Sequence, residues 1–308
     1  MRKLQTFQPG GFWLMIIGAA LWGTIGVAIQ AIYNSDSASS LFINLARTLV
    51  AAPVLLLVCW RVVGRAMFNV QRRDFAIMLL AGTLLAISHA AYFAAIQHTG
   101  VTIATLLTIC IAPLIVSAIS VLLKLETLTR RIGVALVCAL VGSVLLVGLH
   151  APEGTHYDLL LGAFFSLLAA VTYAGMIICG RFLAADYHPL QVTAIGFAAG
   201  AVMLLVVNLV VGTVPVHTVQ GWLLVVYLGL VPTALAYLLF QIGLRSVSAT
   251  AASIVSMLEP LVAALLAWLL FGETLAATGI GGALLLTVSI LLLSLDKPNH
   301  GVLPKAEA

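Results

Sequence analysis

Charge is scarce in this sequence. Only 8% of the 308 residues are Asp, Glu, Lys or Arg, whereas 63% are hydrophobic, and the mean hydropathy is +1.19. A soluble globular domain carries about 25% charged residues, so this composition excludes that class. Apolar runs follow one another with short polar joints, and each is long enough to cross a bilayer, which takes roughly 20 helical residues. The composition predicts an integral membrane protein.

Cysteine is also sparse, and its spacing matches no metal or cofactor pattern. The four cysteines lie within or at the ends of apolar runs, and no CxxC or Cys/His spacing occurs. We therefore expect free thiols, no metal site and no cofactor. The sequence also lacks a zinc-protease HExxH motif, a serine elbow and a Gly-rich phosphate loop, which disfavours an enzyme and a self-contained ATP-driven pump.

Ten apolar runs predict an all-α integral membrane protein with ten transmembrane helices. The first run is too long for a cleavable signal peptide and lacks a small-residue cleavage pattern, so we expect it to remain as the first span. The approximate spans are 12–33, 41–60, 75–97, 101–123, 131–149, 159–181, 189–212, 221–243, 247–271 and 276–295.

Basic residues gather on one side of the predicted bundle. If the N-terminus is cytoplasmic, every Lys and Arg except Arg47 lies on the cytoplasmic side, and the opposite loops carry none. Cytoplasmic loops of membrane proteins carry such an excess of positive charge. We therefore predict that both termini are cytoplasmic and that these charges orient the protein in a lipid bilayer rather than bind nucleic acid.

The chain contains an internal repeat. An offset of 147 aligns APLIVSAISVLLKLETL (112–128) with EPLVAALLAWLLFGETL (259–275), and an offset of 151 aligns Gly11 with Gly162. The repeat predicts two halves of five spans each, the first within 1–150 and the second within 151–308. Because five is odd, the second half enters the membrane from the opposite face. Such inverted repeats are common in secondary transporters, whose halves rock between inward-open and outward-open states.

Several segments resemble the EamA family of the drug/metabolite transporter superfamily. They are GAALWGTIG in the first span, NLARTLVAAPVLLL in the second, and SATAASIVSMLEPLVAALLAWLLFGETL around the ninth. The resemblance covers essentially the whole chain and is weaker in the first half, where Ala112 stands at the position equivalent to Glu259. It implies a multi-pass exporter of small metabolites, such as amino acids or amphipathic drugs, in the bacterial inner (plasma) membrane, with a cavity between the two halves.

Glu259 and Pro260 stand side by side inside an apolar run. Proline removes one backbone hydrogen bond and crowds the carbonyl group of Ser256, so we expect a kink or local unwinding there. Helical rise places Glu259 near the bilayer midplane, where a charged carboxylate costs at least roughly 2.5–3.5 kcal/mol. We predict that Glu259 faces a cavity and serves binding or proton coupling. The alternative is a neutral side chain that caps carbonyl groups freed by Pro260.

The fourth span has a comparable polar face. Thr102, Thr105 and Thr108 follow one another at three-residue steps before Pro113. Hydroxyl groups that bond back to their own helix are as compatible with this stripe as substrate contact. We assign Pro113, like Pro260, to a structural or gating role.

Histidine and mid-span aromatic residues are further candidates. His89 can exchange protons near neutral pH, so proton coupling and a plain helix–helix hydrogen bond are both open. Aromatic rings with polar tips suit an amphipathic solute, with ordinary core packing as the alternative. The predicted cavity residues are Trp22, His89, Tyr92, Thr108, Tyr173, Met176, Tyr237, Gln241, Ser256 and Glu259.

Arg47 is the one basic residue inside a span. It lies near enough to the outer face for its side chain to reach the interface or to pair with Asp36. Its vertical offset from Glu259, about 9 Å by helical rise, allows a direct ion pair only if a helix tilts or breaks. We favour a structural or gating contact. The GxxxG pair Gly196 and Gly200 predicts a close helix contact, either within the fold or between subunits, so a monomer and a homodimer both stay open.

Three function classes compete. The leading one is a secondary transporter that exports a small-molecule substrate (an amino acid, an aromatic metabolite or an amphipathic cation) by alternating access, with proton coupling through Glu259 and His89. A polyanionic substrate is disfavoured because only Arg47 supplies positive charge within the membrane. An intramembrane enzyme would need Glu259 and His89 within about 3 Å or linked by one water. A passive channel would need rings of charge or exposed carbonyl groups.

Overall fold

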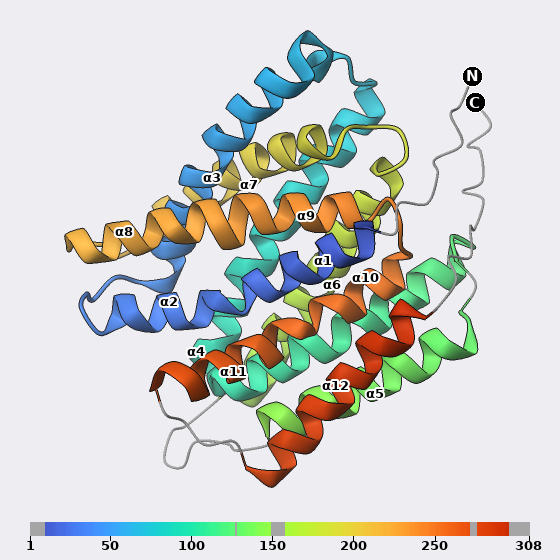
Figure 1. Cartoon of the computed structure of the whole chain (residues 1–308). Helices are drawn as coiled ribbons and strands as arrows, with labels where there is room; N and C mark the ends of the chain where they lie inside the picture. The colour runs from blue at the N-terminus through green and yellow to red at the C-terminus, as the bar shows by residue number, and fades with distance from the viewer. Residues whose placement is uncertain (1–9, 127, 149–157, 272–275, 296–308) are drawn as a thin grey trace.

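The computed structural model of the protein describes residues 10–126, 128–148, 158–271 and 276–295 (Figure 1). Within them lie ten helical spans long and apolar enough to cross a membrane, so the predicted all-α fold and its number of spans are confirmed. The spans are Gly10–Tyr33, Ser40–Phe68, Arg72–Gly100, Thr102–Leu122, Arg130–Val147, Leu159–Leu183, Pro189–Val211, Val219–Gly243, Ala249–Leu270 and Ala277–Ser294.

Twelve α-helices make up these spans, because some spans are interrupted and one helix contains two of them. A 3₁₀ turn, Gly64–Phe68, extends the second span, and a π-helical segment, Gly229–Leu235, lies inside the eighth. The helices are α1 (Gly10–Trp22), α2 (Thr24–Tyr33), α3 (Ser40–Val63), α4 (Arg72–Leu122), α5 (Arg130–Val147), α6 (Leu159–Leu183), α7 (Pro189–Val211), α8 (Val219–Leu228), α9 (Ala236–Gly243), α10 (Ala249–Ser256), α11 (Leu258–Phe271) and α12 (Ala277–Ser294).

Helix α4 contains the third and fourth spans, which are separated by a sharp bend at Gly100. This residue has φ of 75°, a conformation that side chains with a Cβ atom rarely adopt. A glycine therefore allows the chain to turn back within very few residues. Helix α4 continues through Pro113 without a break.

Three spans are interrupted near their middles. The ninth breaks at Met257, so α10 ends at Ser256, the residue whose carbonyl group Pro260 deprives of a partner. The eighth contains Pro232 within its π-helical segment. The first breaks at Gly23, and a Cβ atom there would overlap Val262 and the backbone of the ninth span. The breaks of the first and ninth spans therefore lie against each other.

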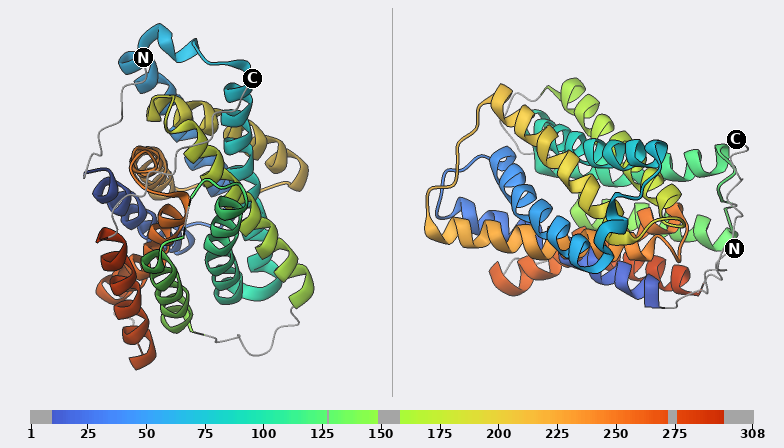
Figure 2. Two further views of the ribbon diagram at one scale, coloured as in Figure 1. Left: turned by 90° about the vertical axis from the view of Figure 1, so that its right-hand side faces the viewer. Right: turned by 90° about the horizontal axis from the view of Figure 1, so that it is seen from above.

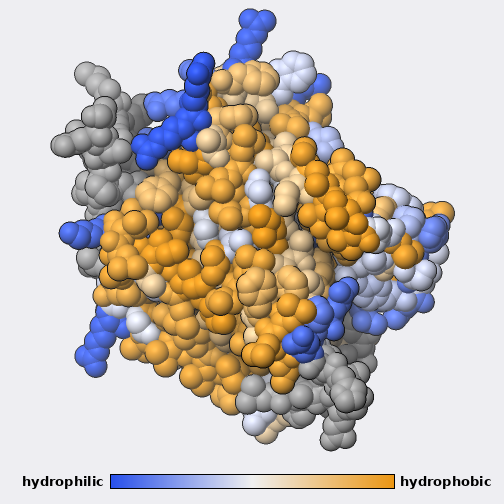
Figure 3. Space-filling view, turned by 180° about the vertical axis from the view of Figure 1, so that it is seen from behind, coloured by the Kyte–Doolittle hydropathy of each residue, from blue (hydrophilic) through white to orange (hydrophobic). Residues whose placement is uncertain are grey.

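The helices form one bundle in which α1 begins and α12 ends at the same end (Figures 1 and 2). The face of the bundle seen in Figure 3 is broadly apolar, and large aliphatic side chains such as Leu160 and Val210 are more than four-fifths exposed. An exposed apolar surface of this extent suits contact with lipid acyl chains.

Glycine allows close helix crossings inside the bundle. A Cβ atom at Gly82 of α4 would overlap the backbone of Gly196 in α7, and Gly200 packs against the same Gly82. The predicted GxxxG contact is therefore made within the fold. Gly142 of α5 and Gly282 of α12 allow these two helices to approach closely as well, because a Cβ atom at either position would overlap the backbone of the other helix. Such small residues are typical of helix packing in membranes, where backbones approach closely.

Candidate functional site

Predicted site residues of three spans meet in the middle of the bundle. The ring of Trp22 in α1 lies 4.8 Å from the ring of Tyr237 in α9, measured between centroids. The Tyr237 hydroxyl group lies 3.4 Å from Nε2 of His89 in α4. Phe197 of α7 packs edge-on against Tyr237 at 5.0 Å. Tyr237 therefore joins four helices through one ring and one hydroxyl group.

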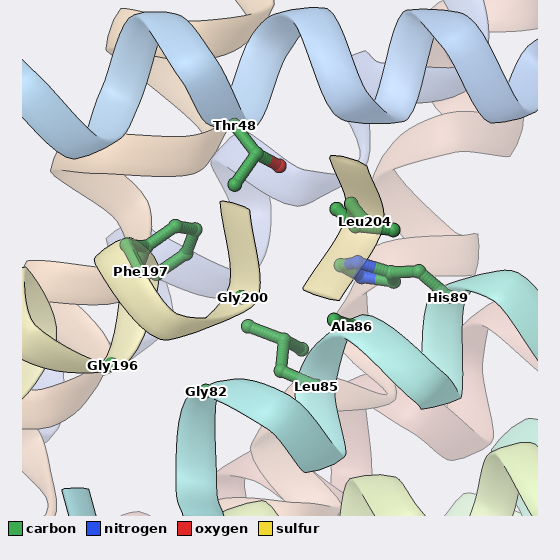
Figure 4. Close-up of a pocket in the computed structure, with 9 residues that line it drawn as sticks. All are labelled: Thr48, Gly82, Leu85, Ala86, His89, Gly196, Phe197, Gly200 and Leu204. Atoms are coloured by element: carbon green, nitrogen blue, oxygen red, sulfur yellow. The ribbon is translucent and has the colours of Figure 1, made fainter. Parts of the chain in front are cut away.

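A small cavity of about 10 Å³ lies beside His89, between α3, α4 and α7. Figure 4 shows His89 and Leu85 of α4 on one side, Thr48 of α3 on another, and Phe197 and Leu204 of α7 completing the wall. Most of its lining is apolar, with polar groups at Thr48 and His89.

Glu259 faces the interior of the protein. It lies in the first turn of α11, directly after the break in the ninth span. Its carboxylate interacts electrostatically with Tyr92, Tyr173 and Tyr237, each from a different helix. Among the described residues, Glu259 makes no hydrogen bond that caps a carbonyl group freed by Pro260. The half-buried carboxylate is thus available to another partner.

Tyrosine and threonine hydroxyl groups connect the helices around Glu259. The hydroxyl groups of Tyr92 and Thr105 lie 2.6 Å apart and join the third and fourth spans. Thr108 donates to the carbonyl group of Ser166 at 3.5 Å, and the Tyr173 hydroxyl interacts with Ser256. Thr105 therefore bonds to the third span and Thr108 to α6, rather than back to the fourth span itself.

Two predicted cavity residues serve packing instead. Gln241 donates from Nε2 to the carbonyl group of Gly180 at 3.0 Å and so joins α9 to α6. Met176 is buried in the hydrophobic core. Met176 belongs to the same buried cluster as Trp22, Phe197 and Tyr237, so both side chains pack beside the candidate site.

Arg47 does not pair with Asp36, which was one of the possibilities that the sequence left open. Asp36 accepts hydrogen bonds from the backbone N–H groups of His217 and Thr218, at 2.7 and 2.8 Å, just before α8. These bonds lower the pKa of the Asp36 carboxyl group, since they stabilise its charged form. Arg47 does not reach the interface either: only 5% of it is exposed, and its Nε donates to Oδ1 of Asn44 at 2.9 Å. The backbone of α3 at Arg47 packs against Gly229, which turns this side chain inward.

Sequence patterns missed Phe197 and Asn44. Phe197 lies between the two glycines of the GxxxG pair, a motif that predicts helix packing. A phenylalanine in the middle of a span is also typical of an ordinary hydrophobic core. Asn44 stands three residues before Arg47, and two polar residues on one face of an apolar span are a signal that could have identified it.

The candidate site residues form neither an acid–base pair nor a metal cluster. The hydrogen-bond partner of His89 is Tyr237, not Glu259. Within the described residues, no group of three His, Cys, Asp or Glu side chains is placed to hold a metal ion. Cys59, Cys110, Cys138 and Cys179 are free thiols.

Comparison with known proteins gives a consistent result over nearly the whole chain. The sequence profile of the EamA-like transporter family matches residues 9–148 and again 160–295. An "Uncharacterized transporter" of Archaeoglobus fulgidus is 32% identical over 273 residues, which is 88% of this chain and 92% of that protein. "Uncharacterized transporter YwfM" of Bacillus subtilis is 28% identical over 91% of this chain and 92% of its own length.

Two further comparisons agree. "Uncharacterized inner membrane transporter YicL" of Salmonella typhimurium is 28% identical over 92% of this chain and 94% of its own length. A solved structure described as "Crystal structure of protein" matches with a TM-score of 0.80 and 19% identity, over 93% of this chain and 96% of that one. At this identity the solved structure shows the fold alone.

Proposed function

Because this chain belongs to the EamA-like transporter family, we propose that it is a secondary transporter that exports a small organic metabolite across the bacterial inner membrane by alternating access. One observation carries the proposal: Glu259 interacts electrostatically with Arg47 and with tyrosines of three other helices, at the level where the ninth span is broken. An intramembrane acid without a fixed partner is suited to binding a solute or a proton.

Packing supports the two inverted repeats. Gly11 packs against Ser246, and Gly162 packs against Thr99. Gly162 lies 151 residues after Gly11, and Ser246 lies 147 residues after Thr99, which are the two offsets of the sequence repeat. The double match of the family profile, once in each half, supports the same division.

The interrupted spans suit a rocking motion. A break in a helix lets its two segments tilt independently, because the hydrogen-bond ladder is not continuous there. The breaks at Gly23 and Met257 touch each other, and the π-helical segment of the eighth span ends immediately before α9, which carries Tyr237. Helix segments that border the site can therefore move without unfolding the bundle.

Proton coupling is assigned to Glu259, with His89 as a second proton carrier. Burial disfavours the charged form of a carboxyl group, whereas the nearby Arg47 favours it. A change in the separation of these two groups between inward-open and outward-open states would change how readily Glu259 binds a proton. That dependence links proton binding to conformation.

The test uses everted membrane vesicles with an imposed pH gradient. Overexpressing cells are first screened for resistance to amino acids, aromatic metabolites and cationic dyes, and a compound that passes is used as the transported solute. We expect Glu259→Gln to abolish proton-linked uptake while the purified protein keeps its thermal stability, and Glu259→Asp to retain part of the activity. Unchanged transport by Glu259→Gln at all pH values would reject the coupling role. If uptake by the native protein does not depend on the pH gradient, a passive facilitator is favoured.

A further inference from the structure

Arg47 has an unused hydrogen-bond donor in the interior of the protein. Its Nη1 atom is buried and has no hydrogen-bond partner, and the same is true of Nδ2 of Asn44, one helical turn away. The two residues are only 5% and 1% exposed. Leaving one buried polar group unpaired costs about 1–3 kcal/mol, and more if the group is charged. The burial of a guanidinium group with an unpaired donor therefore needs a physical explanation.

Other buried polar groups without a partner lie close to Tyr237, with which Arg47 interacts. Trp22, whose ring contacts Tyr237, has a buried indole N–H without a partner, and the hydroxyl group of Thr233, one turn before Tyr237, also has none. Arg47 interacts electrostatically with Tyr237. Trp22, Thr233 and Arg47, which border Tyr237, therefore carry buried polar groups that no acceptor among the described residues satisfies.

The nearby acidic groups do not accept hydrogen bonds from these unpaired donors. Asp36 is engaged by the backbone N–H groups that precede α8. Glu259 interacts with Arg47 electrostatically but leaves Nη1 and the Asn44 amide unpaired. The described residues therefore leave these donors available to an acceptor that enters the site.

We propose that Arg47 and Asn44 form a subsite that binds a carboxylate group of the transported solute; this inference rests on the proposed transport function. A guanidinium group matches a carboxylate in planar, bidentate geometry. One such cation suits a single carboxylate and not a polyanion. The aromatic rings of Trp22, Phe197 and Tyr237, which contact one another in a row, fit an apolar or aromatic body attached to that carboxylate.

Glu259 gives the subsite a distinctive property. When Glu259 is ionised, it competes with a bound carboxylate for Arg47 and repels it; without this charge, Arg47 is left for the solute alone. The geometry thus predicts that Glu259→Gln binds a carboxylate more tightly, whereas a purely structural Arg47 would make carboxylate binding insensitive to this substitution.

Three compounds with the same aromatic body separate the contributions: 3-phenylpropionate carries only a carboxylate, 2-phenylethylamine only an amine, and phenylalanine both. Binding to the purified full chain is measured by tryptophan fluorescence and by thermal stabilisation, which rises with ligand concentration relative to Kd. We expect Arg47→Gln to weaken binding of both carboxylates about tenfold or more. Binding of 2-phenylethylamine should not weaken. Arg47→Lys, which keeps the charge but not the planar fork, should lie in between.

Arg61→Gln is the matched control, because Arg61 lies on the same helix and is exposed at its end. It should bind all three compounds like the native protein. Carboxylate binding that survives Arg47→Gln would overturn the subsite, as would failure of both carboxylates to bind the native protein. If Arg47→Gln does not fold, Asn44→Leu and Glu259→Gln test the same subsite, with weaker and tighter carboxylate binding expected. Gradient-driven transport of a solute without a carboxylate, at a rate that Arg47→Gln does not change, would overturn the subsite but leave the transport function standing.

Discussion

The carboxylate of Asp36 accepts a hydrogen bond of 2.8 Å from the backbone N–H group of Thr218. The loop after α2 in one half of the chain therefore holds the start of α8 in the other. A matching contact joins the backbone N–H group of Gln71, before α4, to the hydroxyl group of Tyr187. Tyr187 lies 151 residues after Asp36, and Thr218 lies 147 residues after Gln71. Related contacts thus connect the two halves at two places.

The Asp36 contact predicts a defined dependence of stability on pH. The backbone hydrogen bonds lower the pKa of Asp36, so its contribution is complete above the ordinary pKa of a carboxyl group and is lost as pH falls through the lowered value. Asp36→Asn should remove this contribution at neutral pH and flatten the acid limb of the stability curve. Thermal unfolding of purified protein from pH 3 to 8 measures both effects. The nearby His217, which also interacts with Asp36, is unchanged in this variant. Ser37→Ala, in the same loop, is the control, and identical acid limbs for Asp36→Asn and the native protein would contradict the prediction.

Gly82 is predicted to be intolerant of even a methyl group. A Cβ atom at this position would overlap the carbonyl group of Gly196, which is backbone and cannot rotate away. Gly82→Ala should therefore lower the free energy of unfolding by about 1–3 kcal/mol. Gly133→Ala is the matched control, because nothing lies within 4 Å of a Cβ atom there, and alanine is the better helix former by about 1 kcal/mol. Equal melting temperatures for the two variants would show that the α4–α7 contact is not this close.

Tyr237 combines ring contacts with one hydroxyl contact, and substitutions separate them. Tyr237→Phe keeps the ring against Trp22 and Phe197 but loses the contact with His89. We expect it to lose about 0.5–1.5 kcal/mol of stability and to change the pH dependence of transport. Tyr237→Ala should lose about 3–5 kcal/mol and most transport.

Tyr227→Phe is the control for the Tyr237 prediction. The Tyr227 hydroxyl group donates to Thr24 at 2.9 Å, also between the eighth and first spans. Its loss should reduce stability by a similar amount without changing transport. A Tyr237→Phe variant with the native pH profile would exclude the His89 contact from the transport cycle.

Helix number and the break at Ser256 could be predicted because both depend on local chemistry. A span needs about 20 apolar residues, and a proline removes a defined hydrogen bond. The break at Gly23 was not predicted, since it coincides with a close contact with the distant Val262. Pro113 leaves α4 unbroken, so the proline alone does not decide whether a helix is interrupted.

The candidate site residues could be selected from the sequence because an acid, a histidine and mid-span aromatic residues are costly or conspicuous in lipid wherever they occur. In the structure, Glu259, His89 and Trp22 all interact with Tyr237. The sequence left the partner of Arg47 open, because it gives the depth of a residue along its helix but not the neighbour that its side chain faces. Gln241 shares a helix face with Tyr237 but bonds to the backbone of α6, a contact that only the tertiary arrangement determines.

Orientation in the membrane can be tested at two exposed positions. Ser37 follows α2, and Ala66 lies in the 3₁₀ turn after α3; the single span between them places these positions on opposite sides. Basic residues flank Ala66 but not Ser37, so the charge distribution places Ala66 in the cytoplasm. In a background without native cysteines, Ser37→Cys should react with an impermeant thiol reagent in intact cells, and Ala66→Cys only after lysis. The reverse pattern would place both termini outside and would overturn the predicted orientation.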